Sequence, residues 1–304
     1  PPRLTVIGGG PIGAEMAQAF ARLGSEVTVI EMAPTLLPRD DPDAAAIVQA
    51  RFEDEGIRVL AGHKVVSARR EGDSRIVTVE SPDGTTIEVV GDEVLAAVGR
   101  RANTADLGAE AAGVEVGKGG VTVDDRMCTT NKRIFAAGDV ASRYQFTHAA
   151  DAMSRLVIRN AFFFGRGRAD HLVMPWATYT DPEVAHVGVT HTEAAEQGLT
   201  TLRVDLSSVD RAILEGEERG FAKLYVDGRG RIRGATVVGP GAGDLIGEAC
   251  LAITSGLEAG ALAATIHPYP TTAEIWRKLG DAYNKTRLTP AAERLFRLWF
   301  RWLR

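Results

Sequence analysis

Short apolar runs alternate with helical patterns along the first part of the chain. Residues 3–8 are apolar and β-branched and end at a glycine, which predicts a short buried strand. A helical run from Pro11 to Phe20 follows directly, and residues 26–31 form a second apolar run. A strand, a helix and a strand within about 30 residues make a βαβ unit, so the pattern predicts a parallel sheet.

The stretch up to residue 98 continues in the same manner. The pattern predicts a helix over 42–55, ended by Gly56, and then a series of strands in which Asp83-Gly84 marks a hairpin turn. The predicted strands cover residues 57–60, 64–70, 74–80, 85–90 and 94–98. Helices and strands in this order are typical of an α/β domain.

The order of elements changes in the later part of the chain. After Asn103 we expect two short strands, a helix that Thr147 caps, and a linker at residues 165–168. The short strands cover residues 121–123 and 134–137, and the helix runs to about Phe164. An α+β layout is predicted from residue 172 onward, with strands near 173–178, 200–206, 219–226 and 231–238 between helices near 191–197, 243–256, 271–285 and 290–303.

Composition and charge narrow the classes of function. The 304 residues are 45% hydrophobic and 25% charged, as in an ordinary globular protein, and carry a formal charge of −5. A mildly acidic chain without a basic stripe is a poor nucleic-acid binder, and no apolar run approaches the roughly 18 residues of a membrane span. With two cysteines, Cys128 and Cys250, we expect a cytoplasmic protein without a disulfide scaffold or a metal site.

The strongest chemical signal is a glycine-rich turn between the first predicted strand and helix. Residues 8–13 read Gly-Gly-Gly-Pro-Ile-Gly, in the context that a dinucleotide-binding G-x-G-x-x-G motif requires. The first glycine of the motif allows a tight turn, the second allows a pyrophosphate to approach the backbone, and the third allows the helix to pack on the strand. The alternative is a glycine-rich turn without a nucleotide. The residues expected to bind the dinucleotide here are Gly8, Gly10, Pro11, Ile12 and Gly13.

Two acids near this turn are candidates for further contacts with the nucleotide. Glu31 ends the second strand, eighteen positions after Gly13, where a carboxylate accepts both ribose hydroxyls and repels a 2′-phosphate. It therefore favours NAD(H) over NADP(H). Glu15 follows Gly13 by two positions, and it either favours the helix N-terminus through its charge or faces the nicotinamide.

A second informative stretch runs from Ile134 to Val140. The expected buried strand ends at Gly138-Asp139, on the edge where α/β sheets bind ligands. An aspartate beside a glycine can bind the hydroxyls of a polyol or ribityl chain. Taken alone, however, a strand followed by an ordinary turn is the better explanation.

Six motifs occur in a fixed order along residues 3–285. They are Gly8–Gly13 with Glu15, then Glu31, Ala97–Asn103, Ala136–Asp139, Thr180–Gly188 and His267–Glu274. In this order they resemble the class I pyridine nucleotide-disulfide oxidoreductases, which include dihydrolipoamide dehydrogenase, glutathione reductase and mercuric reductase. The ordered set is far more specific than any single motif.

The resemblance implies an α/β fold in three parts. These are a Rossmann-like NAD(P)-binding domain over 1–101, the returning half of an FAD-binding domain over 102–170, and an α+β C-terminal dimerisation domain over 171–304. The partners implied are NADH, FAD and a second copy of the chain in a homodimer.

The resemblance also assigns roles to residues outside the glycine turn. Gly99 would lie against the nicotinamide nucleotide, and Gly138 and Asp139 would meet the ribityl chain of FAD. The helix that opens with His148 and Ala149 would point its N-terminus at the flavin.

The chain departs from the family at its redox centre. Members of the family begin with an FAD-binding G-x-G-x-x-G of their own and a Cys-x4-Cys pair, and neither occurs in this sequence. Cys128 and Cys250 are 122 positions apart, and we expect them to be small buried side chains. We therefore expect an N-terminally truncated form that binds NADH weakly, holds FAD poorly and turns over little.

The candidate catalytic residues lie near residue 270. The family's acid–base histidine stands five residues before a glutamate, and counting back from Glu274 gives Tyr269, with His267 two residues earlier. A tyrosine, with a pKa of about 10, can donate a proton but is a poor base at neutral pH. Mercuric reductases resemble the chain in carrying tyrosine there, but it lacks their adjacent cysteine pair near the C-terminus.

Two interpretations of Glu274 remain open. With Tyr269 it would act across a two-fold axis on the partner's flavin. Alternatively it is an acid at a helix N-terminus that Thr271 caps.

The last predicted helix mixes apolar and basic side chains. Apolar residues at positions 292, 295, 296, 299, 300 and 303 form a helical stripe, and Arg294, Arg297, Arg301 and Arg304 lie between them. A basic amphipathic helix can lie on a membrane surface. Docking on its own domain or on a partner subunit is the more common use of such a stripe, and we expect that here.

The expected function is that of an FAD-dependent oxidoreductase. Hydride would pass from NADH to the flavin and on to a disulfide, a metal ion or a quinone-like acceptor. The alternatives are an NADH oxidase or transhydrogenase relative that needs no dithiol, a non-catalytic NAD-binding and dimerisation module, and a fold that retains no ligand.

Overall fold

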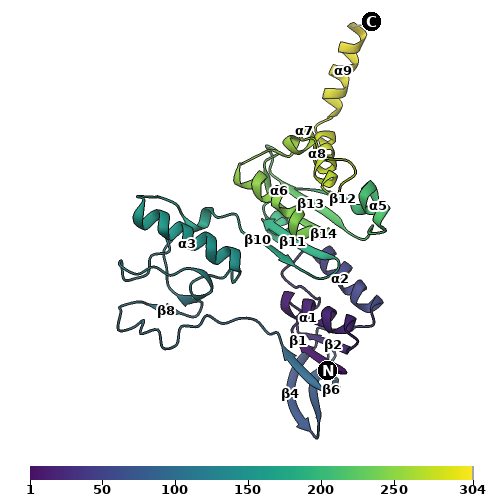
Figure 1. Cartoon of the computed structure of the whole chain (residues 1–304). Helices are drawn as coiled ribbons and strands as arrows, with labels where there is room; N and C mark the ends of the chain where they lie inside the picture. Colours follow the sequence, from purple (N-terminus) through teal and green to yellow (C-terminus); the bar gives the residue numbers. More distant parts are fainter. Residues whose placement is uncertain (303–304) are drawn as a thin grey trace. The chain divides into compact units, whose positions relative to one another are not determined.

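The chain forms two compact units (Figure 1). The computed structural model describes residues 1–302, with the helical backbone alone for residues 291 and 292. Unit 1 combines residues 1–98 with those from 175 onward, and unit 2 covers residues 99–174.

Unit 1 starts with a four-stranded parallel sheet in the order β3-β2-β1-β7. Its elements are β1 (Arg3–Ile7), α1 (Pro11–Arg22), β2 (Glu26–Glu31), α2 (Pro42–Asp54), β3 (Arg58–Ala61) and β7 (Glu93–Ala96). Val6 pairs with Val29 on one side and Leu95 on the other, and Phe52 of α2 is buried in the same core. Since the strands are parallel, the carboxyl ends of β1 and β2 meet at one edge of the sheet. The predicted βαβ unit is confirmed.

A three-stranded antiparallel sheet is inserted between β3 and β7. Its strands are β4 (Lys64–Glu71), β5 (Ser74–Glu80) and β6 (Thr86–Gly91). The turn between β5 and β6 has Gly84 at a φ of +85°, and a carboxylate oxygen of Asp83 accepts the N–H of Thr85 at 2.9 Å. The hairpin predicted from Asp83-Gly84 is therefore confirmed.

The C-terminal part of unit 1 is built on a five-stranded antiparallel sheet in the order β10-β11-β14-β13-β12. Its strands are β10 (Pro175–Thr178), β11 (Glu183–Gly188), β12 (Thr200–Asp205), β13 (Phe221–Val226) and β14 (Ile232–Gly239). Its helices are α4 (His191–Glu196), the short η3 (Leu206–Ser208), α5 (Asp210–Glu215), α6 (Ala242–Thr254), α7 (Ala259–Ala264), α8 (Glu274–Thr286) and α9 (Pro290–Trp302). The elements β11, α5 and α7 were not predicted from the sequence. Among the described residues, no helix is long and apolar enough to cross a membrane.

The two parts of unit 1 share one core. Val184, Phe221 and Val238 from the C-terminal sheet belong to the same buried cluster as Val6 and Phe52. The α/β region and the C-terminal sheet therefore fold against each other as one body.

Unit 2 is smaller and less regular. Its elements are β8 (Val116–Gly117), β9 (Gly120–Val121), η1 (Gly138–Val140), α3 (Thr147–Phe162) and η2 (Ala169–His171). Met127, Met153 and Leu156 form a buried cluster beneath α3.

Two predictions for unit 2 are wrong. Residues 134–137 are half-buried and form a single bridge, between Phe135 and Cys128, so they are no buried strand. A ladder needs a neighbouring strand along its length, and here the pairing ends after that bridge. Thr147 is the first residue of α3, whose N-cap is Phe146 without a side-chain hydrogen bond.

Candidate dinucleotide-binding site

The glycine turn after β1 has two glycines that cannot carry a side chain and a third that faces open space. Gly8 has a φ of +106°, and a Cβ there would lie 2.4 Å from the carbonyl oxygen of Ala97. A Cβ on Gly13 would lie 1.8 Å from the carbonyl oxygen of Gly8. A Cβ on Gly10 would meet no atom within 4 Å. Packing therefore requires the first two glycines, while Gly10 leaves space for a ligand to reach the backbone.

The N-terminus of α1 opens at this position. Pro11 is the first helical residue, and the N-cap Gly10 has no side chain to bond the first N–H groups. These groups have no acceptor within the helix and carry the positive end of its dipole. The side chain of Ile12 is 44% exposed and thus lies outside the core. The turn has the form of an anion site suited to a diphosphate.

Glu31 ends β2 beside this turn. One of its carboxylate oxygens accepts the N–H of Gly9 at 2.6 Å, and the other accepts the N–H of Ala33 at 2.7 Å. The two bonds fix the carboxylate at the edge of the sheet and use two of its roughly four acceptor positions. The remaining two suit a pair of ribose hydroxyls, and the negative charge disfavours a phosphate at the same place.

Glu15 has a structural contact that the sequence did not indicate. It lies beyond the first turn of α1, where the helix dipole has little effect. Its Oε1 accepts the backbone N–H of Tyr179 at 2.9 Å, which joins α1 to the segment after β10. A contact with nicotinamide stays a prediction.

The residues expected to contact FAD lie in unit 2. Gly138 has a φ of +77°, and a Cβ there would lie 2.9 Å from the Cβ of Ala150 in the first turn of α3, where Ala149 is fully buried. Asp139 is half-exposed, with a carboxylate oxygen 3.7 Å from the guanidinium of Arg100. The turn thus packs tightly on α3 and presents a carboxylate outward, which fits a polyol ligand.

Gly99 is the first residue of unit 2. It has a φ of +109°, and a Cβ there would meet no atom within 4 Å. Glycine adopts this conformation without strain. The expected contact with a nicotinamide nucleotide stays a prediction.

His267 is bound to a residue that the sequence analysis missed. Its imidazole is 5% exposed, and Nε2 lies 3.0 Å from Oε1 of Glu248 on α6. Glu248 and Asp244 are the two acids of the otherwise apolar helix α6, and an acid in the middle of such a helix is a signal for a buried partner. His267 and Glu248 thus form a partly buried pair of their own.

Tyr269 and Glu274 have partners of different kinds. The Tyr269 side chain is 71% exposed, and its hydroxyl donates to Oδ2 of Asp210 at 3.0 Å. This bond and the charge of Asp210 raise the pKa of Tyr269, so the phenol stays protonated at neutral pH. Glu274 is the first residue of α8 and pairs with Arg277.

The expected cap of α8 is wrong. The N-cap of α8 is Ala273, and the hydroxyl of Thr271 donates instead to the carbonyl of Pro268 at 2.6 Å. The hydroxyl of Thr271 therefore bonds within the turn that precedes α8 and does not cap the helix.

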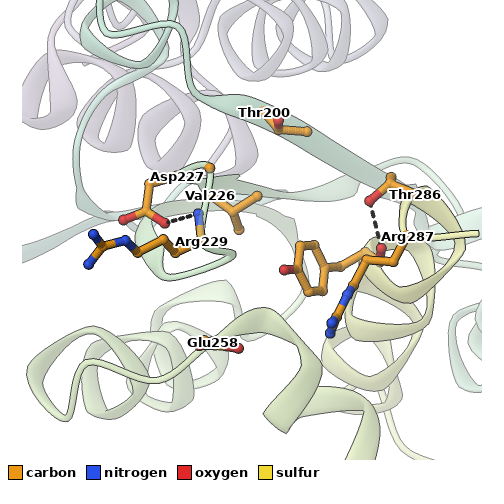
Figure 2. A pocket seen from close by; sticks show the side chains of 9 residues that line it. Thr200, Val226, Asp227, Arg229, Glu258, Thr286 and Arg287 are labelled. Carbon is orange, nitrogen blue, oxygen red and sulfur yellow. Dashed lines mark hydrogen bonds between the residues drawn. The ribbon is translucent and has the colours of Figure 1, made fainter. Parts of the chain in front are cut away.

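A cavity of about 460 Å³ lies elsewhere, between the β13–β14 turn and the C-terminal end of α8 (Figure 2). Asp227, Arg229, Glu258 and Arg287 line it. Oδ1 of Asp227 accepts the N–H of Arg229 at 2.9 Å, a bond that stabilises the turn itself. No predicted site residue lines this cavity, and its charges are balanced, so it offers no alternative site.

The family of the chain follows from two matching family models. The model described as pyridine nucleotide-disulphide oxidoreductase matches residues 1–154, and that of the dimerisation domain of the same family matches residues 174–279. The chain belongs to the pyridine nucleotide-disulphide oxidoreductase family. Members of this family are enzymes that use FAD and NAD(P)H.

Relatives of the chain include mercuric reductases and dihydrolipoyl dehydrogenases. A mercuric reductase of Streptomyces lividans is 40% identical over 93% of this chain and 60% of its own length. A dihydrolipoyl dehydrogenase of Thermus scotoductus is 39% identical over 94% of this chain and 62% of its own length. The chain thus spans about 60% of the length of these relatives.

Solved structures of the family have the same fold. The flavoprotein disulfide reductase RclA from Escherichia coli, solved as a Cu(II) complex, superposes with a TM-score of 0.83 at 30% identity, over 92% of this chain and 64% of RclA. LpdA from Mycobacterium tuberculosis gives a TM-score of 0.85 at 29% identity, over 92% of this chain and 61% of LpdA.

The two cysteines of this family member differ in burial. Cys128 is buried, as expected, but Cys250 is half-buried, which corrects the expectation for it. Burial raises the pKa of the Cys250 thiol, so it is a weak nucleophile at neutral pH.

Proposed function

We propose that the glycine turn of this chain binds NADH and that the chain serves an FAD-dependent reductase in which hydride passes from NADH to the flavin. The observation that supports this most is the geometry of the turn. Gly8 and Gly13 are required by backbone contacts, whereas Gly10 lies open at the N-terminus of α1.

Each residue of the proposed site has a binding or positioning role. When bound, NADH supplies the hydride and FAD accepts it. The first turn of α1 holds the diphosphate of the nucleotide, and Glu31 accepts the ribose hydroxyls and disfavours NADPH. Asp139 binds the ribityl hydroxyls of FAD. The proposed domains are those expected from the sequence, with 1–101 and 102–170 contributing to the two cofactor sites and 171–304 to a homodimer.

FAD, when bound, would supply electrons to a disulfide, a metal ion or a quinone-like acceptor. We assign Tyr269 the role of a proton donor in this step, because its phenol is exposed and stays protonated at neutral pH. It would act on the acceptor bound at the partner's flavin. Arg277 holds the carboxylate of Glu274 at the start of α8, and His267 holds the loop to α6 through Glu248.

Calorimetric titration with NADH and NADPH tests the binding step. The wild-type chain should bind NADH at least tenfold more tightly than NADPH, and Glu31→Gln should reduce this preference. Gly10→Ala should weaken NADH binding at least tenfold without lowering Tm, because a methyl group there occupies the open space. Gly119→Ala is the matched control, since a Cβ there also meets no atom within 4 Å, and it should leave both values unchanged.

Two outcomes would contradict the proposal. Either the wild type gives no heat with NADH, or Gly10→Ala binds NADH as tightly as the wild type. A chain that binds NADH but never bleaches the absorbance of added FAD would instead be a binding and dimerisation module, and hydride transfer would be withdrawn.

A further inference from the structure

The apolar side chains of α9 are exposed. Between 42% and 90% of the surface of each described apolar side chain is accessible. These residues are Leu295, Phe296, Leu298, Trp299, Phe300 and Trp302. The described residues of the stripe therefore do not dock on their own domain, which corrects that half of the expectation, while docking on a partner subunit stays a prediction. Leu303, expected to belong to this helix, and Arg304, named with its basic residues, lie outside the described residues.

The apolar face of α9 is broad. At 3.6 residues per turn, the six exposed apolar side chains span an arc of roughly 200° around the helix. Phe300 stacks on Trp299 and Phe296, with ring centroids 5.7 and 6.4 Å apart, so the aromatic rings form a continuous surface. A partner helix would cover only a narrower stripe of this face. The acyl chains of a lipid layer can cover the whole apolar face.

The polar face of α9 is narrow and basic. Arg294, Arg297, Arg301 and Glu293 fall within the remaining arc of roughly 100°. The described helix therefore carries a net charge of +2, in a chain whose formal charge is −5. The long arginine stems can lie along an apolar surface while their guanidinium groups reach anionic headgroups.

We propose that α9 binds to the surface of an anionic lipid bilayer, with its aromatic face among the acyl chains and its arginines at the phosphate groups. Trp299 and Trp302 are suited to this boundary because the indole ring combines an apolar body with an N–H donor. The thirteen described helical residues extend about 20 Å, less than the hydrocarbon thickness, and their basic face suits a position along the surface. The proposal is independent of the proposed hydride transfer.

Vesicle binding by the whole 304-residue chain tests this proposal. Vesicles of phosphatidylcholine alone are compared with vesicles that also contain phosphatidylglycerol, by co-sedimentation and by tryptophan emission. Trp276 is fully buried and Trp176 is half-buried, so a blue shift on binding reports mainly on Trp299 and Trp302. We expect at least tenfold stronger partition into the anionic vesicles, and a loss of this binding at high salt.

Charge-reversal variants separate a specific contact from the effect of overall charge. Arg297→Glu with Arg301→Glu should weaken binding to anionic vesicles more than tenfold. Arg133→Glu with Arg166→Glu is the matched control, because it changes the net charge equally at two exposed arginines outside α9. The control should bind as the wild type does, and both variants should keep the Tm of the wild type.

The aromatic variant Trp299→Ser with Phe300→Ser decides between a membrane and a second copy of the chain. The proposal expects it to lose vesicle binding and to keep its sedimentation coefficient. If the wild type ignores anionic vesicles, or if both charge variants bind equally, the proposal is overturned. It is also overturned if the aromatic variant falls apart into monomers and the wild type binds no vesicles, since α9 then packs on a second copy.

Discussion

Trp176 contacts two titratable groups that respond to pH in opposite directions. Its indole N–H donates to Oδ1 of Asp40 at 2.8 Å, and its ring packs on the imidazole of His186 with centroids 4.3 Å apart. Burial raises the pKa of Asp40 to about 6 and lowers the pKa of His186 to about 4. Asp40 precedes α2 and His186 lies on β11, so this contact joins the α/β region to the C-terminal sheet.

The two groups should oppose each other in the pH dependence of stability. The pKa of Asp40 is raised on folding, so its contribution is present below about pH 4 and is lost as the pH rises through about 6. The pKa of His186 is lowered, so its contribution is present above about pH 6.5 and is lost as the pH falls towards about 4. In the wild type, the two changes of stability with pH partly cancel between about pH 4 and pH 6.5.

Asp40→Asn should leave the pH dependence of stability that His186 causes without the opposing effect of Asp40. The amide oxygen can still accept from Trp176, but the buried carboxylate is gone. We expect the Tm of the variant to exceed that of the wild type by a few degrees near pH 7.5 and to fall more steeply on acidification. Thermal unfolding across this pH range measures both, with Asp73→Asn in an exposed turn as the control. Parallel curves for wild type and variant would contradict the assignment.

At the residue scale, the sequence predicted those parts of the site whose geometry depends on neighbouring residues. Gly13 packs on the carbonyl of Gly8 within the turn, and Gly8 has a φ of +106°, so a short motif can encode both requirements. His267 and Tyr269 are different, because their partners Glu248 and Asp210 stand 19 and 59 positions away. Such partners follow from the packing of α6 and α5 against the loop, which no local pattern contains.

At the scale of elements, most strands and helices of unit 1 were predictable, but not what holds them together. Lys223 lies in the middle of β13, whose six residues are all buried. Its Nζ lies 2.8 Å from both carboxylate oxygens of Asp41, the N-cap of α2, and 2.7 Å from Asp43. Tyr225 also donates to Asp41 at 2.9 Å. A lysine in an apolar strand indicates a buried partner, but the sequence does not say where that partner is.

Lys223→Met should destabilise unit 1 strongly. The side chains of Lys223 and Asp41 are 5% and 1% exposed, so removing the ammonium leaves a buried carboxylate without its counter-charge. Breaking such a pair costs about 3–5 kcal/mol. Urea unfolding measures the loss, and Lys132→Met, at a lysine 74% exposed, should change stability by less than about 0.5 kcal/mol. Asp41→Asn combined with Lys223→Met should recover part of the loss; equal effects of the two lysine variants would contradict this account.

At the scale of the whole molecule, the C-terminal part of unit 1 exposes large apolar side chains. They are Ile213 and Leu214 on α5, Leu251 on α6, and Ile266 and Tyr269 in the loop between α7 and α8. All lie within residues 174–279, which match the dimerisation model of the family. Exposed apolar groups in a region that matches a dimerisation model are candidates for the dimer contact. The sequence predicted a dimer from its resemblance, but the residues that form the contact depend on which side chains the fold leaves outside.

Ile266→Glu should therefore shift the chain from dimer to monomer. Ile266 is 95% exposed and stands three positions before Tyr269, so in a two-fold dimer its side chain should be covered together with that tyrosine. A carboxylate there would be buried twice, once in each half of the symmetric contact, and its desolvation opposes association. Sedimentation velocity over a range of concentrations measures the change, with Val66→Glu on β4, 55% exposed, as the control that stays dimeric. If Ile266→Glu remains a dimer at every concentration, the loop lies outside the interface, and Tyr269 cannot reach across a two-fold axis to the partner's acceptor.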